Sequence, residues 1–371
     1  MSVRLGTFNI ENLLSRFDFS GYRNELHQDR SLRLFDIRSE AEFQRLEEAR
    51  LIASTDDTRQ LSALAIVDMD ADILCLQEVD SIEALKAFEY GYLFRMTGEG
   101  YRQKYLMEGN DSRGIDVALM MRDTTRSGAP IELTDIRSHA RLTYADLGLF
   151  TPELAALDYK PQDRIFKRDC LEADLKIGGV ALSLYVVHFK SMNGGRNGLD
   201  GRVASVPVRH AEARAVREII TRRFGGSPES SANYAICRDM NDYGEKLQVG
   251  GDKRSGYSFT PVLEPGSVAD ILAADGFAEN VVARRPIDDR WTHFHQRGPS
   301  ERHLSQLDYI WLSPHLAGLN RDAVPDIIRA GQPYRTIFPP GQAVERYPRV
   351  GWDRPKSSDH CPVVIELDLM S

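Results

Sequence analysis

The sequence predicts an α/β protein built on a mixed sheet, or on two packed sheets, with helices outside. Short apolar runs typical of strands alternate with amphipathic helical patterns along the 371 residues. Some consecutive strands are joined by a tight turn and others by a helix, so both antiparallel and parallel neighbours are expected. With 42% hydrophobic residues, a chain of this length buries a large core.

The expected elements follow one another in a regular order. Strands are predicted at residues 3–10, 72–78, 115–122, 233–237, 307–312 and 362–369, and helices at 58–69, 81–90, 205–224 and 267–275. Residues 170–177 and 180–187 are predicted to form a hairpin, because Gly178 and Gly179 suit the turn between them. Stretches near 13–57, 123–168 and 314–356 fit poorly, and we interpret them as irregular insertions in one domain spanning residues 1–371.

Cysteine content, net charge and hydropathy exclude several classes of protein. The four cysteines are widely scattered, which predicts reduced thiols in the core rather than disulfides or a zinc cluster: Cys75, Cys170, Cys237 and Cys361. A net charge of -8 argues against nucleic-acid binding through a broad basic surface, although not against an enzyme that acts on phosphates. No segment approaches the roughly 18 apolar residues of a membrane span, and no signal pattern opens the chain, so we expect a cytoplasmic protein without membrane insertion.

Polar side chains gather at the ends of the predicted strands. The clusters contain carboxylates, amides and imidazoles, and their members are Asn9 with Glu11, Glu78, His188 with Lys190, Asp239 with Asn241, and Asp359 with His360. Each cluster alone has an ordinary interpretation, such as a solvated glutamate at a strand exit. Together they suggest one metal-assisted hydrolytic site.

Glu78 is the candidate anchor for a metal ion. A hard cation such as Mg²⁺ needs only one or two carboxylates, together with water and substrate oxygens, so a single strand-end glutamate suffices. Asn9 and Glu11 are two residues apart, and regular strand alternation would place them on one face, directed at the same ion or phosphate.

Asp308 and His360 form the candidate acid–base pair. Asp308 is a charge inside an apolar strand, which is costly unless the carboxylate is paired. A hydrogen bond to His360 would pair it, fix the imidazole tautomer and raise its basicity. His188 ends another strand, and the polar, glycine-containing turn after it, with Lys190 and Asn193, suits a phosphate. No phosphate-binding P-loop, nucleophile elbow or His-Glu-x-x-His helix is present in the sequence.

At these residues the chain resembles the endonuclease/exonuclease/phosphatase superfamily. The motifs appear in the family's order between Leu5 and Leu369: Thr-Phe-Asn-Ile, Leu-Gln-Glu-Val, Arg-Gly-Ile-Asp-Val-Ala, Val-His-Phe-Lys-Ser, Asp-Met-Asn-Asp, Leu-Asp-Tyr-Ile and Ser-Asp-His-Cys-Pro-Val. The resemblance implies a four-layer α/β/β/α sandwich of two packed mixed sheets flanked by helices. It also implies that the site lies at one edge of the sandwich.

The resemblance further implies roles for individual residues. Glu78 would be the principal ligand of Mg²⁺ (or Mn²⁺), with Asn9, Glu11 and Asp359 in or near the metal shell. His360, oriented by Asp308, would contact the scissile phosphate or help to generate the nucleophile. Asp239 and Asn241 would activate and position water, and His188 would serve the leaving group.

Arg238 departs from the family pattern, which usually has glycine before the Asp-x-Asn motif. Glycine there permits close approach of the backbone. Arg238 either contacts the substrate phosphate, which is the interpretation favoured here, or crowds the site. Alternation along a strand would turn its side chain away from the side that Asp239 faces.

These observations predict a divalent-metal-dependent phosphoesterase that hydrolyses phosphodiester bonds, with an endonuclease or exonuclease acting on DNA or RNA as the first choice. Arg113, Lys190 and Asn193 are the expected phosphate contacts, with Lys167, Arg168 and Arg196 as further cations, although each also fits an ordinary solvated face. The alternative is a phosphodiesterase or phosphatase acting on a small-molecule, phosphoinositide or phospholipid phosphoester, which the acidic net charge favours. A catalytically weakened binding module is the alternative from another class, with Arg238 as its sole support.

Overall fold

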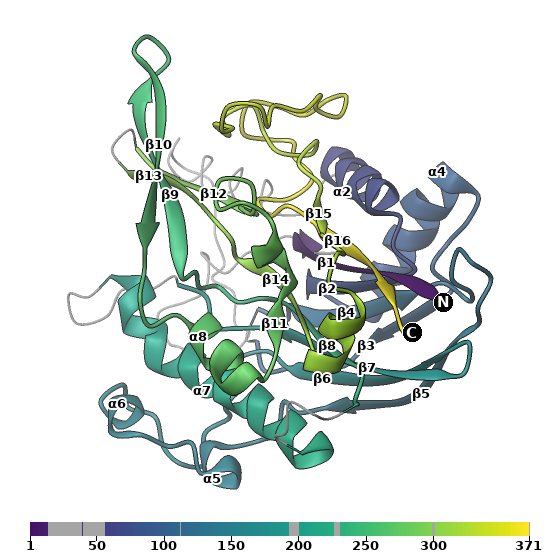
Figure 1. Cartoon of the computed structure of the whole chain (residues 1–371). Coiled ribbons are helices and arrows are strands. Elements are labelled where there is room, and N and C mark those ends of the chain that lie inside the picture. The colour runs from purple at the N-terminus through teal and green to yellow at the C-terminus, as the bar shows by residue number, and fades with distance from the viewer. Residues whose placement is uncertain are drawn as a thin grey trace.

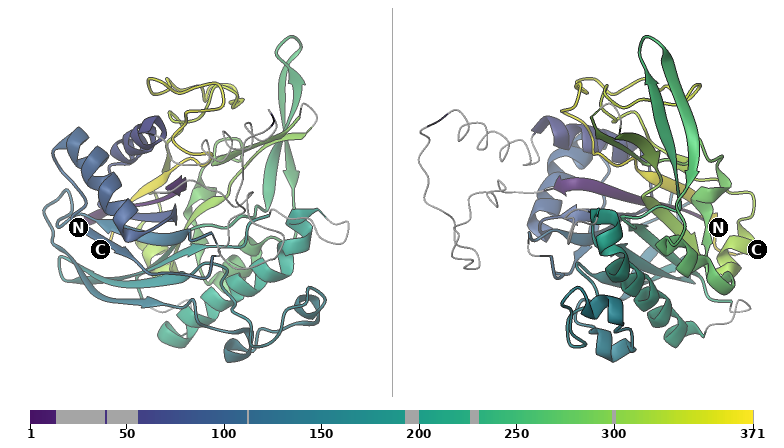
Figure 2. Two further views of the ribbon diagram at one scale, coloured as in Figure 1. Left: turned by 180° about the vertical axis from the view of Figure 1, so that it is seen from behind. Right: turned by 90° about the vertical axis from the view of Figure 1, so that its left-hand side faces the viewer.

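Two six-stranded mixed sheets lie face to face at the centre of the molecule (Figures 1 and 2). The structure is a computed structural model that describes residues 1–13, 39, 56–111, 113–192, 200–225, 231–298 and 301–370. The expected insertion near 13–57 therefore lies almost wholly outside the described residues.

The first sheet has the order β15-β16-β1-β2-β4-β3. Its strands are β1 (Ser2–Leu13), β2 (Ile73–Val79), β3 (Gln103–Leu106), β4 (Asp116–Met121), β15 (Asp326–Ile327) and β16 (Val363–Asp368). β1 and β2 are parallel, and the other neighbours are antiparallel. α2 (Asp56–Met69), α3 (Ile82–Phe88), a π-helical segment (Glu89–Phe94) and α4 (Arg95–Thr97) cover its outer face.

The second sheet has the order β11-β14-β8-β7-β6-β5. Its strands are β5 (Ile131–Ser138), β6 (Cys170–Ile177), β7 (Val180–His188), β8 (Tyr234–Asp239), β11 (Glu279–Asn280) and β14 (Asp308–Leu312). β7 and β8 are the parallel pair. α7 (Gly201–Phe224) and α8 (Val268–Ala273) cover its outer face, and α5 (Tyr144–Leu147) and α6 (Pro152–Ala155) lie beyond α7.

The alternation of apolar residues along the strands creates three parallel core layers. Leu5, Cys75, Val186 and Cys237 belong to the cluster between the two sheets, and they are fully buried. In several strands, the residue that follows such a core residue faces outward. The outward-facing residues belong to two further clusters, one packed under α2 and α3 and the other under α7 and α8. The predicted four-layer sandwich is therefore confirmed.

Most predicted elements occur within a few residues of their expected positions. The hairpin β6–β7 turns at Gly178 and Gly179, whose φ angles of 54° and 90° are conformations that glycine adopts without strain. Helix α7 begins at Gly201, four residues before the predicted start, because Asp200 caps the backbone N–H of Arg202. The remaining short elements are α9 (Pro314–Leu319) and two 3₁₀ turns, Ala274–Gly276 and Val281–Arg284.

One expectation about the chain is wrong, and one sheet was not predicted. The stretch 123–168 is not wholly irregular, because residues 131–138 form β5, which pairs with β6 at the edge of the second sheet. A third, four-stranded sheet was not predicted. It has the order β10-β9-β13-β12, with β9 (Glu245–Asp252), β10 (Gly256–Leu263), β12 (His293–Arg297) and β13 (Glu301–Ser305), and it projects beyond the sandwich (Figure 1).

None of the helices in the described part of the chain is long and apolar enough to cross a membrane.

All four cysteines should be unreactive in the native protein, because each is a free, fully buried thiol. Burial also raises the pKa of the Cys75 thiol, which lowers the fraction of reactive thiolate. We expect negligible reaction with a thiol reagent such as DTNB in buffer, and reaction of all four cysteines in denaturant. Rapid labelling of the native protein would contradict this placement.

Candidate active site

The predicted catalytic residues converge at one edge of the sandwich, where several strands end. β7 and β8 run in parallel with His188 beside Asp239, and the antiparallel strand β14 places Asp308 opposite Asp239. Asn9 comes from the other sheet, and its Nδ2 donates a 3.0 Å hydrogen bond to Asp239 Oδ2. This bond joins the catalytic edges of the two sheets.

Asp239 is the hub of the cluster. Its Oδ1 accepts a hydrogen bond from the backbone N–H of Asn241 at 2.8 Å, and its Oδ2 accepts one from Asn241 Nδ2 at 3.1 Å. Two imidazoles approach the same oxygen, with Nε2 of His188 at 3.4 Å and Nε2 of His360 at 3.8 Å. Although burial opposes it, the attraction of His360 and then of His188 holds the pKa of Asp239 well below its usual range. Asp239 is therefore a carboxylate at neutral pH.

Asp308 and His360 are paired as the sequence predicted. The separation between His360 Nδ1 and Asp308 Oδ2 is 2.8 Å, although the two residues are 52 positions apart in the chain. Burial raises the pKa of Asp308 to about 6, while His360 lowers it. The pKa of His360 is raised, because the attraction of Asp308, Asp239 and Asp359 outweighs the burial that would lower it. With Nδ1 directed at Asp308, Nε2 faces the other carboxylates.

Glu78 and His188 occupy the side of the cluster nearest the first sheet. Glu78 Oε2 accepts a 3.0 Å hydrogen bond from the backbone N–H of Asn12, while Oε1 lies 3.8 Å from His188 Nε2. Burial lowers the pKa of His188, and Arg168 lowers it further, so this imidazole is neutral. Its Nδ1 is buried without a hydrogen-bond partner in the described structure.

Glu11 does not share the face of Asn9 in the manner expected from strand alternation. Glu11 and Asn12 have φ angles of 52° and 56°, and the pairing of β1 with β2 shifts register after Asn9. The carboxylate of Glu11 forms ion pairs with Arg354 at 2.7 Å and Lys356 at 3.1 Å. Burial raises its pKa, with Asp359 nearby as a second cause. Glu11 therefore holds the loop before Asp359 in place.

The backbone is strained where the site residues leave their strands. Glu78 and Asn241 have φ angles of 67° and 47°, which side chains other than glycine rarely adopt. Such conformations persist only where surrounding contacts enforce them, and they concentrate at functional sites. Here the strained turns direct the Glu78 carboxylate and the Asn241 amide towards the cluster.

The donor set fits a divalent cation. The ligand atoms of Asp359, His360 and His293 lie within 4.8 Å of one another. The same is true of Asp239, Asp308 and His360. Glu78 lines the cavity beside these residues, and its Oε1 is available there because only Oε2 accepts the hydrogen bond from Asn12. Carboxylate oxygens suit Mg²⁺ or Mn²⁺, whereas imidazole nitrogens are more typical ligands of zinc, copper, iron or nickel.

The expected phosphate contacts have different positions. Arg113 lines the hollow and pairs with Asp111, while Lys190 directs its Nζ to Ser191 O at 3.0 Å and does not line it. Asn193 lies outside the described residues. Arg168, expected only as a further cation, is buried in the wall and donates from Nη1 to Phe189 O at 2.7 Å.

The cluster around Asp239 opens into a hollow of about 500 Å³ whose far wall is the third sheet. His293 is the link, because β12 forms a bridge to His360 and the two imidazole centroids are 5.2 Å apart. Burial and the neighbouring His360 lower the pKa of His293 to about 3. The sequence did contain a signal for this wall: His293, His295 and Arg297 alternate with other residues in a period of two, as do Glu301, His303 and Ser305.

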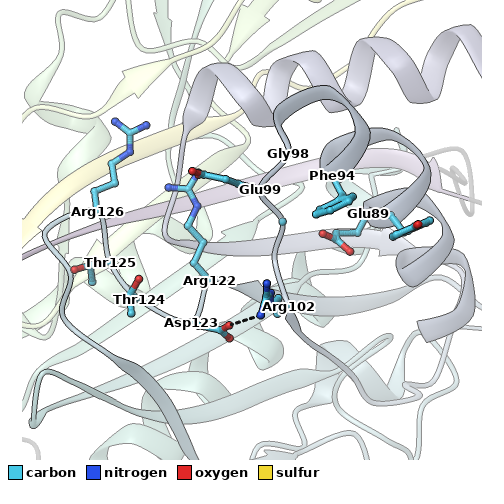
Figure 3. A pocket seen from close by; sticks show the side chains of 12 residues that line it. Glu89, Phe94, Gly98, Glu99, Arg102, Arg122, Asp123, Thr124, Thr125 and Arg126 are labelled. Atoms are coloured by element: carbon cyan, nitrogen blue, oxygen red, sulfur yellow. Dashed lines mark ion pairs between the residues drawn. The ribbon is translucent and has the colours of Figure 1, made fainter.

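A larger hollow, about 940 Å³, lies near the opposite end of the first sheet, by Arg122 (Figure 3). Its arginines are engaged in ion pairs: Arg102 with Asp123 at 3.8 Å, Arg122 with Asp70 at 2.7 Å, and Arg126 with Asp70. No histidine is among its described lining residues. It therefore offers no second catalytic constellation.

Comparisons with known proteins agree on the fold. No family model matches the sequence, and no curated protein matches it. Among solved structures, an endonuclease/exonuclease/phosphatase family protein from Bacteroides thetaiotaomicron is 14% identical, with a TM-score of 0.51 over 99% of this chain and 95% of that one. TDP2 from D. rerio is 11% identical, with a TM-score of 0.51 over 99% of both chains. Truncated TDP2 from Caenorhabditis elegans is 11% identical, with a TM-score of 0.50 over 99% and 97%.

The chain has the endonuclease/exonuclease/phosphatase fold.

Within this endonuclease/exonuclease/phosphatase fold, Arg238 is the residue that departs from the family's sequence pattern. The prediction that Arg238 contacts the substrate phosphate is wrong. Its neighbour Cys237 faces the core between the sheets, so Arg238 faces the opposite way, into the layer under α7. The side chain is fully buried, with its guanidinium carbon 4.4 Å from the Phe189 ring centroid and 5.9 Å from that of Trp311. None of its three nitrogens has a hydrogen-bond partner in the described structure, and burial lowers its pKa to about 9.

Replacing Arg238 by methionine should stabilise the protein. A buried charge without hydrogen bonds is costly, and an apolar side chain of similar length removes that cost, by about 1–4 kcal/mol in comparable substitutions. Arg238→Gly should be less stable than Arg238→Met by about 2 kcal/mol or more, because it empties the same space. Denaturant unfolding of the three proteins measures both differences. A methionine variant that is the least stable would show that the guanidinium is paired.

Proposed function

We propose that this protein is a divalent-metal-dependent phosphodiesterase, with nuclease activity as the first candidate. The observation that carries the proposal is the constellation at the buried carboxylate of Asp239. The Asn9 amide from β1 and the Asn241 amide just after β8 donate to it, the imidazoles of His188 and His360 lie beside it, and His360 is also paired with Asp308. Hydrolysis at phosphorus needs an acceptor for the proton of water and donors for the phosphoryl oxygens. The constellation contains both.

Glu78 and Asp359 are the proposed metal-binding carboxylates, and Asn9 holds Asp239 in position beside them. A bound divalent ion would stabilise the negative charge that develops on the phosphoryl oxygens. The fit rests on the donor chemistry of the hollow, into which these two carboxylates, Asp239 and His360 all open. Glu11 is proposed as a positioning residue rather than a ligand, because its carboxylate is held by Arg354 and Lys356.

Asp239 is the proposed acceptor of a proton from the attacking water, and Asn241 positions it. Asp239 remains ionised at neutral pH. The backbone N–H of Asn241 donates to its Oδ1, and the side-chain amide of Asn241 donates to its Oδ2. His360, with Nδ1 bound to Asp308, would present a protonated Nε2 to a phosphoryl oxygen. His188, neutral and next to both Glu78 and Asp239, is proposed to serve the leaving group.

Support for nucleic acid comes from one neighbour. The D. rerio TDP2 structure, which shares the fold, is complexed with a single-strand DNA product. Against the binding-module alternative, Arg238 does not enter the site, so its departure from the pattern leaves the catalytic residues unobstructed. A small-molecule or lipid phosphoester remains the competing substrate class. Assays with single-stranded DNA, RNA, bis(p-nitrophenyl) phosphate and p-nitrophenyl phosphate separate these classes.

Activity on bis(p-nitrophenyl) phosphate should require Mg²⁺ or Mn²⁺ and be abolished by chelator. Glu78→Gln should weaken metal binding about tenfold or more, because a carboxylate ligand is lost, while far-UV circular dichroism stays unchanged. Calorimetric titration of Mn²⁺ measures the affinity directly. Glu83→Gln, on the exposed face of α3, is the matched control. Full turnover in chelator, or equal Mn²⁺ affinity in Glu78→Gln, would refute the metal site.

Asp308→Asn should lower kcat by roughly a hundredfold or more, with a small effect on KM, because the imidazole loses the partner that fixes its tautomer. The substitution should also lower the pKa of His360, since Asp308 is the strongest attraction that raises it. Histidine NMR titration detects that shift independently of turnover, and Asp322→Asn at an exposed position is the control. A His360 pKa equal to that of the wild type would show that the pair is not formed.

A further inference from the structure

The third sheet presents one polar face to the catalytic hollow. Side chains from three of its strands line the hollow in continuity with Asp239 and His360, and they are Lys246, Gln248, His293, His295, Arg297 and His303. The strand register explains the grouping, because His295 pairs with His303 and His303 pairs with Gln248, so that their side chains share one face. The opposite face carries Leu247, Phe294 and Leu304, which pack in a small core of their own. The polar face is therefore fixed by the folding of the sheet.

The side chains on this face are held in place by one another. The rings of His295 and His303 stack with their centroids 4.7 Å apart, and Tyr243 lies 5.5 Å from His303. Lys246 Nζ pairs with Glu264 at 2.6 Å and lies 5.9 Å from the Tyr243 ring. Arg297 is exposed at the outer end, and no ion pair is formed by its guanidinium within the described ranges. The wall thus combines the stacked imidazoles of His295 and His303 with the available cation of Arg297.

Both acids and bases line the hollow. Three of its carboxylates belong to the proposed site, Glu78 and Asp359 as metal ligands and Asp239 as the base. The remaining described lining residues comprise three acids and five bases, namely Asp200, Glu264 and Glu301 against Arg113, Arg168, Arg202, Lys246 and Arg297. Four of these bases are paired with carboxylates, Arg113 and Arg168 with Asp111, Arg202 with Asp242, and Lys246 with Glu264. Arg297 is therefore the available cation of this wall, and it suits a ligand whose negative charge continues beyond the scissile phosphate.

The spacing of the donors along β12 suits a repeating anion. His293, His295 and Arg297 occupy alternate positions of one extended strand, so their side chains are about 6.7 Å apart. Successive phosphates of an extended nucleic-acid strand have a comparable separation. With His293 next to His360, a phosphate at the catalytic cluster would place the following phosphates near His295 and Arg297.

We propose that this face of the third sheet binds the phosphates that follow the scissile one, so that the substrate is an extended single-stranded phosphodiester chain rather than a compact phosphate ester. The inference rests on the proposed phosphodiesterase function. Arg297 supplies charge, Lys246 supplies a charge that it shares with Glu264, and the stacked rings of His295 and His303 supply a stacking surface. The acidic protein thereby concentrates its phosphate contacts in one groove instead of on a broad basic surface.

The test compares substrates that differ in the number of phosphates. Wild-type kcat/KM is measured with Mn²⁺ on bis(p-nitrophenyl) phosphate and on DNA oligonucleotides of two, three and five residues. We expect kcat/KM to rise from the dinucleotide to the longer strands, mainly through a lower KM. Arg297→Ala and Lys246→Ala should each reduce the ratio of pentanucleotide to dinucleotide kcat/KM by roughly threefold, as the loss of a partly exposed ionic contact does. Arg254→Ala, in the β9–β10 turn outside the groove, is the matched control and should keep the wild-type ratio.

A binding measurement makes the test independent of turnover. In a Glu78→Gln background, the affinity for a fluorescein-labelled pentanucleotide should fall with salt, and Arg297→Ala should reduce the slope of log K against log salt by about 0.7, the value for one contact to a single strand. A duplex of the same sequence should bind more weakly. Hydrolysis of bis(p-nitrophenyl) phosphate without any preference for length would overturn this inference and leave the proposed function intact. A length preference or salt slope that survives in both variants, or tighter duplex binding, would also overturn it, whereas no hydrolysis of any phosphodiester would instead contradict the proposed function.

Discussion

The hydrogen bond between Asn9 and Asp239 is the contact on which the site depends. It joins a strand of one sheet to a strand of the other at the single edge where their polar ends meet. Asp239 is 1% exposed, and a buried carboxylate without partners would cost several kcal/mol. The Asn9 and Asn241 amides and the nearby imidazoles of His188 and His360 offset that cost. The same interactions therefore stabilise the edge of the sandwich and fix the geometry of the site.

The apolar core between the sheets determines which residues reach that edge. Residues such as Cys75, Val186 and Cys237 are packed between the sheets, which fixes the register of their strands. A slip of one residue would exchange the two faces of a strand, so packing also fixes where Glu78, His188 and Asp239 emerge. Strained conformations at Glu78 and Asn241 then re-aim the side chains at the ends. The site thus requires rigid strands followed by abrupt turns.

Arg238 shows how the same alternation separates structural from functional residues. Asp239 lies in the polar cluster at the sheet edge, while its neighbour Arg238 is turned under α7 against Phe189 and Trp311. An arginine in a phosphate-processing motif is chemically plausible as a ligand contact, but strand geometry excludes that role here. Conversely, His293 belongs to no motif identified in the sequence, yet it lies beside His360 because β12 folds back onto the segment before β16. Position in the fold decides the role in both cases.

The sequence by itself determined the layered fold and the polar residues that meet around Asp239. Apolar alternation is a local property, so β1, β2, the β6–β7 hairpin and β8 were predictable, and their polar ends identified Glu78, His188 and Asp239. The cost of a charge inside an apolar strand also predicted the pairing of Asp308 with His360. Only the tertiary structure decided that Glu11 pairs with Arg354, that Arg238 is buried, and that a third sheet walls the hollow. Positive φ angles break the alternation at Glu11, and polar strands such as β9, β12 and β13 acquire their core through contacts between distant segments, which no local pattern encodes.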